Sequence, residues 1–287
     1  MITRFAPSPT GYLHLGHVVN AIYVWGLAHA AGGRVLLRVE DHDRIRSRAT
    51  FERAILEDLA WLGFVPDEGL HPVRRQSANN EAYVAALARL QSTHRVYICT
   101  CSRKEIGGER YPGTCRSRHL LPGDTAPPDA GIRVELDTLP EEFADRALGT
   151  IVQTPSEQCG DLLLKDRDGN WTYQFAVTVD DINDGVDLVI RGVDLLSSTG
   201  RQIKLARMLG RTTPPAFYHH PLIMRPDGEK LSKASGDTGV RELRAAGQTP
   251  AAVIGLAAAA VGLIDGPAPV GVAASSGLIR APERGRR

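Results

Sequence analysis

Two histidines flank a glycine in the segment His14-Leu15-Gly16-His17. The segment follows a short apolar run and a stretch containing two prolines and a glycine, so it lies where a strand gives way to a helix. Backbone N–H groups at a helix N-terminus favour anions, phosphates above all, and a glycine lets a nucleotide approach the backbone closely. The alternative is a Pro-rich loop that carries two surface histidines. The position after a strand favours a phosphate site.

A second segment, Lys230-Leu231-Ser232-Lys233-Ala234, carries two lysines three positions apart. Only five of the 34 basic residues are lysines and the rest are arginines. Because arginine is the usual cation of this chain, two lysines at fixed places indicate that the ammonium group is required. Two ammonium groups and a hydroxyl suit the negative charge of a triphosphate. A solvated charged loop is the alternative interpretation.

Three cysteines, Cys99, Cys101 and Cys115, lie close together in the sequence. The first residues of the chain lack the charged-then-apolar pattern of a secretory signal, so a cytoplasmic location is expected and metal ligands are favoured over disulfide partners. Zinc prefers four tetrahedral ligands with sulfur prominent. The residues alone suggest His119 or His94 as the fourth ligand. Three buried free cysteines are the alternative.

Apolar periodicity predicts the elements that position these motifs. In the first third of the chain, short apolar runs alternate with stretches of helical spacing, which indicates a parallel sheet with helices on its faces. The predicted strands are residues 2–6 and 34–39, and the predicted helices are residues 13–31, 47–62 and 81–91.

The pattern changes after residue 98. Residues 99–129 are rich in Cys, Arg, Gly and Pro without a clear period, which indicates an inserted module. Asp168-Gly169 is a hairpin signal that predicts pairing of the run 171–177 with the strand before it. Further predicted elements are strands at 131–137, 160–165 and 186–193, helices at 195–209 and 241–263, a short strand before 224, and a frayed tail at 266–287.

Composition excludes several classes of protein. The chain has 287 residues, of which 43% are hydrophobic and 23% charged, as in an ordinary globular protein. It has no apolar run long enough to span a membrane. The formal net charge of +1 argues against a globally basic coat for nucleic acid, although a local basic surface remains compatible with it.

Together, the histidine and lysine segments resemble the two signature motifs of class I aminoacyl-tRNA synthetases. Further segments resemble the glutamyl subgroup of that family: residues 4–11, residues 39–43, Asp180-Asp181, and residues 189–192. The departures are small: Leu15 replaces the common Ile, and the lysine motif ends in Ala234. The resemblance implies an α/β, Rossmann-like catalytic domain with a parallel sheet, an inserted zinc-binding module and a short helical C-terminal stem.

The resemblance also implies residue roles. His14 and His17, with Gly16, would contact the α-phosphate region and ribose of ATP. Lys230 and Lys233 would stabilise the departing phosphates, and magnesium would arrive with ATP. The two histidines and the two lysines are the expected catalytic residues. The resemblance also implies a pocket for glutamate, in which the planar guanidinium groups of two arginines match a carboxylate. Surface ion pairs are the alternative interpretation of these two arginines. The pocket residues are Arg4, Ala6, Ser8, Glu40, Tyr173 and Arg191.

The cysteine pattern is similar to the zinc site of the glutamyl-Q subgroup, in which a Cys-x-Cys pair is completed by a tyrosine and a third cysteine. This implies one structural zinc held by Cys99, Cys101, Tyr111 and Cys115. His119 is the second choice for the fourth ligand.

The length after the lysine motif distinguishes the subgroups. Glutamyl-tRNA synthetases carry a large anticodon-binding domain there, whereas the glutamyl-Q subgroup does not. The resemblance therefore implies an enzyme that attaches glutamate to the queuosine base at the wobble position of tRNA(Asp). A monomer is expected. A truncated synthetase charging the tRNA 3′ end, an inactive tRNA-binding paralogue and a small nucleotidyltransferase are the alternatives. The expected parts are residues 1–97 and 171–236 for the catalytic domain, 98–125 for the zinc insert, 126–170 for connecting strands, 237–265 for the stem and 266–287 for the tail.

Overall fold

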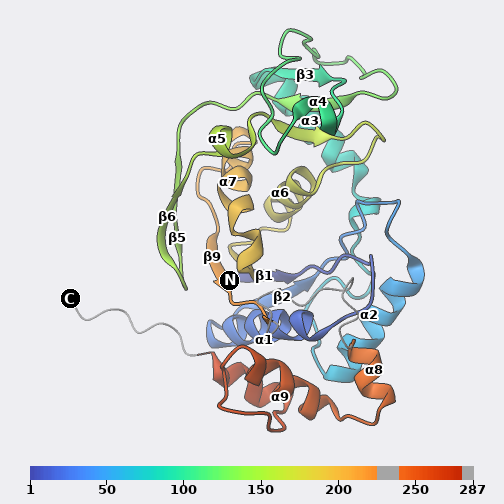
Figure 1. Cartoon of the computed structure of the whole chain (residues 1–287), viewed down its shortest axis with the longest axis vertical. Helices are drawn as coiled ribbons and strands as arrows, with labels where there is room; N and C mark the ends of the chain where they lie inside the picture. The colour runs from blue at the N-terminus through green and yellow to red at the C-terminus, as the bar shows by residue number, and fades with distance from the viewer. Residues whose placement is uncertain (225–238, 280–287) are drawn as a thin grey trace, which may run out of the picture.

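Parallel strands form the centre of the molecule. The computed structural model of the chain describes residues 1–224 and 239–279. Strand β1 pairs in parallel with β2, and β8 pairs in parallel with β9. The two pairs lie side by side, because the backbone N–H of Asp187 donates to the carbonyl of Ile2 at 3.0 Å (Figure 1). The α/β fold with a parallel sheet is therefore confirmed. The strands are β1 (Ile2–Phe5), β2 (Arg34–Leu37), β8 (Leu188–Gly192) and β9 (Ala216–His220).

A two-stranded ribbon extends this sheet beyond β9. Strand β5 (Glu141–Asp145) joins β9 in parallel through the pair Asp145 and Phe217, and β6 (Gly149–Gln153) pairs antiparallel with β5. Residues of β5 alternate between buried and exposed, as expected for a strand with one covered face. The ribbon stands at one side of the molecule (Figure 1). Asp145, the last residue of β5, is buried.

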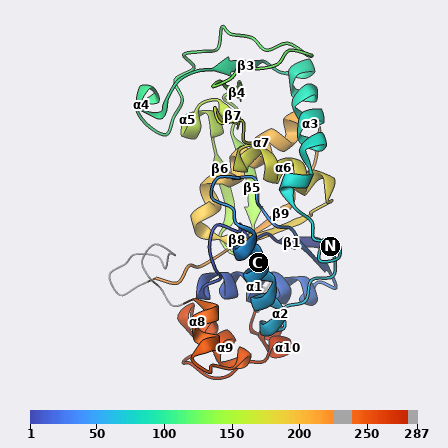
Figure 2. The same ribbon diagram turned by 90° about the vertical axis from the view of Figure 1, so that its right-hand side faces the viewer.

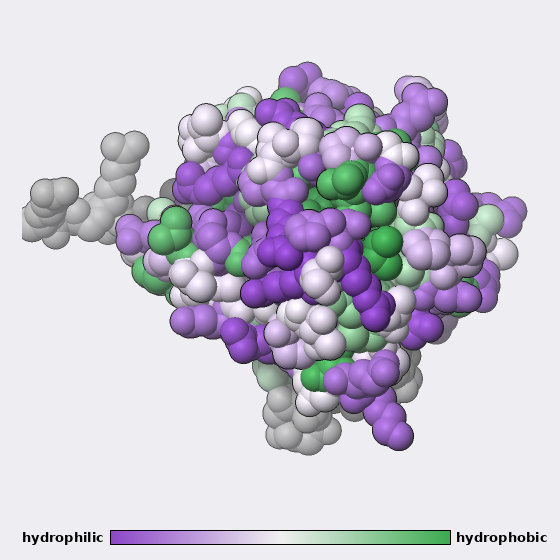
Figure 3. Space-filling model, turned by 90° about the horizontal axis from the view of Figure 1, so that it is seen from above, coloured by the Kyte–Doolittle hydropathy of each residue, from purple (hydrophilic) through white to green (hydrophobic). Residues whose placement is uncertain are grey.

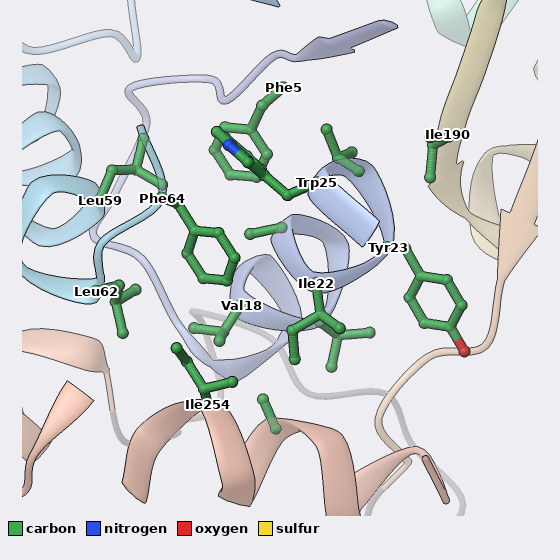
Figure 4. Packing of buried hydrophobic residues seen from close by; sticks show 14 of the residues in the cluster. Phe5, Val18, Ile22, Tyr23, Trp25, Leu59, Leu62, Phe64, Ile190 and Ile254 are labelled. Atoms are coloured by element: carbon green, nitrogen blue, oxygen red, sulfur yellow. The ribbon is translucent and has the colours of Figure 1, made fainter. Parts of the chain in front are cut away.

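Helices α1 (Leu15–Ala30) and α2 (Ala49–Leu62) cover one face of the sheet. Helix α1 is apolar around most of its circumference, because the strands lie above it and α9 (Pro250–Ala260) lies below it. Figure 4 shows Trp25 between Phe5 and Phe64, with ring-centroid distances of 5.4 and 5.2 Å. Aromatic pairs at these distances fill the core and fix the position of α1.

Strands between residues 96 and 165 form a separate antiparallel sheet at the upper end of the molecule (Figure 2). Its strands run in the order β3-β4-β7, and the expected strands at 131–137 and 160–165 are confirmed in shorter form. Viewed from above, this end is covered mostly by hydrophilic residues with smaller apolar patches between them (Figure 3). The elements are α3 (Asn80–Thr93), β3 (Val96–Cys99), α4 (Arg103–Ile106), β4 (Gly131–Val134), α5 (Pro155–Cys159) and β7 (Leu162–Lys165).

The expected hairpin after Asp168-Gly169 is mostly wrong. Only Trp171 pairs with Lys165, and helix α6 (Tyr173–Asn183) starts directly afterwards. The apolar residues of this stretch recur three and four positions apart and face the core, which stabilises a helix over a strand. Helix α7 (Thr199–Met208), preceded by the 3-10 helix η2 (Val193–Ser198), packs against α6.

The C-terminal region differs from its prediction in two ways. The single helix expected at 241–263 is two helices, α8 (Val240–Ala245) and α9, because Gly247 adopts φ +81° and Pro250 starts the second helix with Thr249 as its cap. The expected tail is ordered as far as it is described: α10 (Val272–Ser275) and the 3-10 helix η4 (Ser276–Leu278) pack against α1 (Figure 2). No helix in the described part combines the length and apolar character that a membrane crossing requires.

Candidate active site and metal centre

A cavity of about 730 Å³ opens at the carboxyl ends of the parallel strands. This is the edge at which open parallel sheets bind their ligands. Residues that follow β1, β2, β8 and β9 line it, together with the start of α1. All the described residues of the predicted glutamate and ATP sets line this one cavity: Arg4, Ala6, Ser8, His14, Gly16, His17, Glu40, Tyr173 and Arg191.

The histidine pair is built into the start of α1. His14 is the N-cap residue, and its Nδ1 accepts a hydrogen bond from the Gly16 N–H at 3.1 Å. The His17 Nδ1 accepts in turn from the His14 N–H at 3.1 Å, and the two rings are 4.0 Å apart. Because both Nδ1 atoms accept, the proton of each neutral ring is on Nε2. The pair therefore presents N–H donors of the kind that a phosphate oxygen accepts.

Gly16 has a specific steric reason to be glycine. A Cβ atom at this position would lie 2.9 Å from Cε1 and 3.0 Å from Nδ1 of His14. Real Cβ contacts are almost never this short, so any side chain here would displace the ring. The sequence suggested that this glycine makes room for a nucleotide; the structure shows that it also makes room for the capping imidazole.

Arg4 and Glu40 line the cavity from the ends of β1 and β2. Arg4 is 5% exposed; its Nε lies 3.3 Å from Asp181 and its Nη1 donates to the carbonyl of Ile190. Burial raises the pKa of Glu40, although Arg38 and Arg4 oppose this shift. The Glu40 carboxylate accepts from Arg38 Nη2 at 3.1 Å. Both groups are thus held in fixed positions by buried partners.

Arg38, which sequence analysis did not single out, is the centre of a buried ionic cluster. It is 1% exposed, and its Nη1 lies 2.8 Å from Asp181 and 3.0 Å from Asp184. Asp180, 3.7 Å from Arg38, also accepts hydrogen bonds from the side chains of Gln76, Asn79 and Tyr83. A buried arginine with this many carboxylate partners ties β2 to α6 beneath the cavity. The only sequence signal was a charged residue within an apolar run.

Other residues of the cavity were also missed, among them Asn20 and His220. His220 ends β9, its Nε2 lies 3.2 Å from Asn20 Oδ1, and its ring stacks on Tyr23 at 5.0 Å. Burial lowers the pKa of His220 to about 4, so this ring is neutral at pH 7. The available signal was its position directly after an apolar strand, where site residues gather in parallel sheets.

Lys230 and Lys233 lie outside the described residues. The chain on either side of them lies at the cavity: Ile223 lines it, and Val240 donates from its backbone N–H to the carbonyl of Leu13 at 2.9 Å. Gly239 forms a β-bridge with His14. The last described residues before the gap therefore lie at the cavity, and the first described residue after it pairs with His14.

The cysteine cluster lies in the part of the structure built around the β3-β4-β7 sheet, and none of its residues lines this cavity. The Sγ atoms of Cys99, Cys101 and Cys115 all lie within 4.8 Å of one another, and those of Cys101 and Cys115 are 3.5 Å apart. Zinc–sulfur bonds of about 2.3 Å in a tetrahedron require similar separations, so the three thiols fit a zinc ion. Cys159 is not a member of this group.

Tyr111 packs directly against the three cysteines. Its ring is 2% exposed, and its phenol oxygen accepts from the Cys115 N–H at 2.8 Å. Although burial opposes the shift, hydrogen bonds from the Thr100 backbone and the Tyr111 side chain lower the pKa of Cys115 to about 7. A thiolate is therefore accessible near neutral pH. His119 is exposed and is not part of the cluster.

The fold and the cavity define an α/β domain with a cavity at the carboxyl ends of its parallel strands. The family model for the catalytic domain of class I tRNA synthetases (E and Q) matches residues 1–259, and the chain belongs to this family.

Curated relatives match nearly the whole chain. A glutamyl-Q tRNA(Asp) synthetase of Symbiobacterium thermophilum is 42% identical over 93% of this chain and 88% of its own length. A glutamyl-Q tRNA(Asp) synthetase of Pseudomonas aeruginosa is 40% identical over 91% of this chain and 90% of its own. Among solved structures, a glutamate tRNA ligase from Elizabethkingia meningosepticum in complex with its amino acid has a TM-score of 0.75 and 27% identity. That match covers 96% of this chain and 64% of the ligase chain.

Proposed function

We propose that this chain activates L-glutamate with ATP and transfers the glutamyl group to the queuosine base of tRNA(Asp). The observation that carries the proposal is the single cavity that brings the histidine pair together with Arg4, Glu40 and Arg191. The curated relatives, which match along about nine-tenths of both lengths, bear the corresponding name and support the choice of acceptor.

The first step joins glutamate to the α-phosphorus of ATP. A carboxylate oxygen of glutamate attacks that phosphorus, the bond to the bridging oxygen breaks, and pyrophosphate leaves. His14 and His17 donate from Nε2 toward the phosphate and ribose, and the N–H groups at the start of α1 add positive potential. Lys230 and Lys233 stabilise the charge on the leaving phosphates, with magnesium bound to ATP. The chain supplies position and charge, without a covalent enzyme intermediate.

Glutamate is recognised by opposite charges on opposite sides of the cavity. The guanidinium of Arg191, together with Arg4, binds the side-chain carboxylate through planar paired donors. The Glu40 carboxylate attracts the α-ammonium group, and Tyr173 supplies a hydrogen bond from the start of α6. Ala6 and Ser8 belong to the wall that follows β1.

The metal is structural in this proposal. Cys99, Cys101, Cys115 and Tyr111 hold one zinc ion, which ties β3 to the loop that follows α4. A zinc ion with four protein ligands has no open position for substrate, so its contribution is the stability of the module.

Two assays test the proposal. Exchange of labelled pyrophosphate into ATP should depend on glutamate and should proceed without RNA. Labelled glutamate should then be transferred to tRNA(Asp) that contains queuosine and not to the same tRNA without it. The likeness to a glutamate tRNA ligase favours a second candidate, charging of the 3′ end. Equal labelling of tRNA with and without queuosine would support that candidate and reject the first.

A further inference from the structure

A buried chain of hydrogen bonds connects the cavity to strand β5. At the cavity end, Arg191 on β8 donates from Nε to His219 Nε2 at 3.1 Å, from Nη1 to Gln202 Oε1 at 2.7 Å and from Nη2 to Thr199 Oγ1 at 2.8 Å. At the other end, His219 Nδ1 lies 2.6 Å from Asp145 Oδ2. The side chains that form these hydrogen bonds are almost completely removed from solvent, with exposed fractions of 4% for Arg191, 1% for His219 and 3% for Asp145.

The hydrogen bonds determine which nitrogen of His219 carries its proton. The Nε group of Arg191 always carries hydrogen, so the His219 Nε2 that faces it must accept. The Thr199 hydroxyl, which accepts from Arg191 Nη2, is 3.2 Å from the same Nε2 and can donate to it. The proton of the neutral ring is therefore on Nδ1, where Asp145 accepts it. Burial lowers the pKa of His219, as does the charge of Arg191, and outweighs the opposite effect of Asp145.

We propose that Asp145 and His219 are positioning residues for glutamate recognition, and that Asp145 acts by fixing the tautomer of His219 that holds Arg191 in place. Three N–H groups of Arg191 are used by His219, Gln202 and Thr199. One further N–H remains on each terminal nitrogen, on the cavity that Arg191 lines together with Tyr173. The Tyr173 side chain also hydrogen-bonds to this guanidinium, and a substrate carboxylate would meet it beside Tyr173. The role of Arg191 toward glutamate rests on the proposed function; the tautomer and its dependence on Asp145 do not.

Asp145 is suited to this role because its two oxygens have different partners. Oδ1 accepts from the backbone N–H groups of Ala147 and Leu148 at 2.9 and 3.0 Å, which fixes the carboxylate plane at the turn between β5 and β6. Oδ2 is left for His219. In an Asp145→Asn variant the amide oxygen keeps the two backbone donors, so the amide NH₂ must face His219 Nδ1. The proton of the ring then moves to Nε2 and points at a hydrogen of Arg191. Two donors facing each other in a buried site repel, and Arg191 turns away.

The test is Asp145→Asn in the full-length chain, with steady-state ATP–pyrophosphate exchange as the readout. We expect KM for glutamate to rise by about tenfold or more, the size of one lost buried hydrogen bond to a charged group, with KM for ATP nearly unchanged. Nitrogen NMR of histidine-labelled protein should show the proton of His219 on Nδ1 in the wild type and on Nε2 in the variant.

Glu141→Gln is the matched control. Glu141 is a buried carboxylate on the same face of the same strand, but it pairs with Lys204 and Arg207 of α7, away from the cavity. This variant should lose stability and keep KM for glutamate. Equal rises in KM for glutamate in both variants, an unchanged KM in Asp145→Asn, or a wild-type His219 with its proton on Nε2 would each overturn the proposal. If the wild type shows no glutamate-dependent exchange, the proposed function fails, while the NMR experiment still decides the tautomer of His219 and its dependence on Asp145.

Discussion

At the scale of single residues, His14 has two roles: it caps helix α1 and it lines the cavity. Its Nδ1 caps the helix through Gly16, which leaves Nε2 as the donor on the other side of the ring. The helix N-terminus and the imidazole are thus oriented by the same hydrogen bond. A change that breaks the cap should also misplace the donor, and this coupling can be tested at the glycine.

Gly16→Ala should reduce activity without destabilising the protein. The new Cβ would lie 2.9 Å from the His14 ring and would displace it, whereas alanine favours helix over glycine by roughly 1 kcal/mol. We expect kcat/KM for ATP in pyrophosphate exchange to fall by roughly tenfold or more, the effect of one lost donor to phosphate. The midpoint of thermal unfolding should be maintained or raised.

Gly266→Ala is the control for this variant, because a Cβ at Gly266 would meet open space. It should leave exchange unchanged. Wild-type exchange in Gly16→Ala would contradict the coupling of cap and donor.

At the scale of secondary-structure elements, helices α2 and α8 meet at a buried carboxylic acid. Asp58 on α2 is 3% exposed, and its Oδ2 has no hydrogen-bond partner among the described residues. Burial raises the pKa of Asp58 to about 6, although Arg244 and Arg241 of α8 oppose the shift. The two arginines lie over the rings of Trp61 and Tyr12, at 5.5 and 4.4 Å from the ring centroids. The helix that follows the lysine segment is thus packed on α2 and on the residues before the histidine pair.

Asp58→Asn should stabilise the protein at neutral and alkaline pH. The folded pKa lies above the usual 3.8, so the folded state binds the proton more tightly than the unfolded state. Wild-type stability from this group therefore falls as pH rises between about 4 and 6, and stays lower above. At pH 8 the variant should gain about 1–3 kcal/mol in the free energy of unfolding. The gain should vanish below about pH 4.

Urea denaturation at a series of pH values measures this difference. Glu57→Gln, an exposed neighbour on the same helix, serves as control and should show a much smaller change. A variant that is equally stable relative to wild type at pH 4 and pH 8 would refute the raised pKa.

The thiol cluster of the β3-β4-β7 module yields another prediction at this scale. Purified protein should contain about one zinc per chain, and Cys101→Ser should lose it and expose residues 98–125 to amide hydrogen exchange. Tyr111→Phe should release zinc to a chelator faster than wild type, since the phenol oxygen beside Cys115 is removed. His119→Ala, which alters an exposed side chain outside the cluster, should retain zinc as wild type does. Faster zinc release from His119→Ala than from Tyr111→Phe would assign the fourth ligand position to His119.

Residues 266–279 close the lower face of the whole molecule. Ile279 is 6% exposed, and its side chain packs so closely on α1 that a Cβ at Gly26 would lie 2.9 Å from it. Ser275 is buried, and the Ser276 hydroxyl lies 3.2 Å from His29 Nδ1. The segment therefore belongs to the same core as α1 and α9, and none of its residues lines the cavity.

A chain that ends at Asp265 should be less stable than one that ends at Ile279. Loss of the buried contacts on α1 should lower the free energy of unfolding by about 2–4 kcal/mol. For a chain of this size, the midpoint of thermal unfolding should then fall by roughly 4–15 °C. Calorimetry of the two truncated proteins makes the comparison, with exchange activity at low temperature expected in both. Equal midpoints would show that this segment contributes no stability.

The sequence by itself determined the parallel α/β fold, most of the elements and some of the residues that line the cavity. Periodicity and breakers such as Gly32 and Gly63 are local, and the motif residues follow strands that meet at one edge of a sheet. Only the tertiary structure decided that the run after Trp171 is helical, that residues 266–279 pack on α1, and that Asp145 and His219 support Arg191. The last two outcomes depend on partners 28 to 253 positions away. Burial against a distant surface outweighs local preference, and no local pattern records which distant side chain will supply a hydrogen bond.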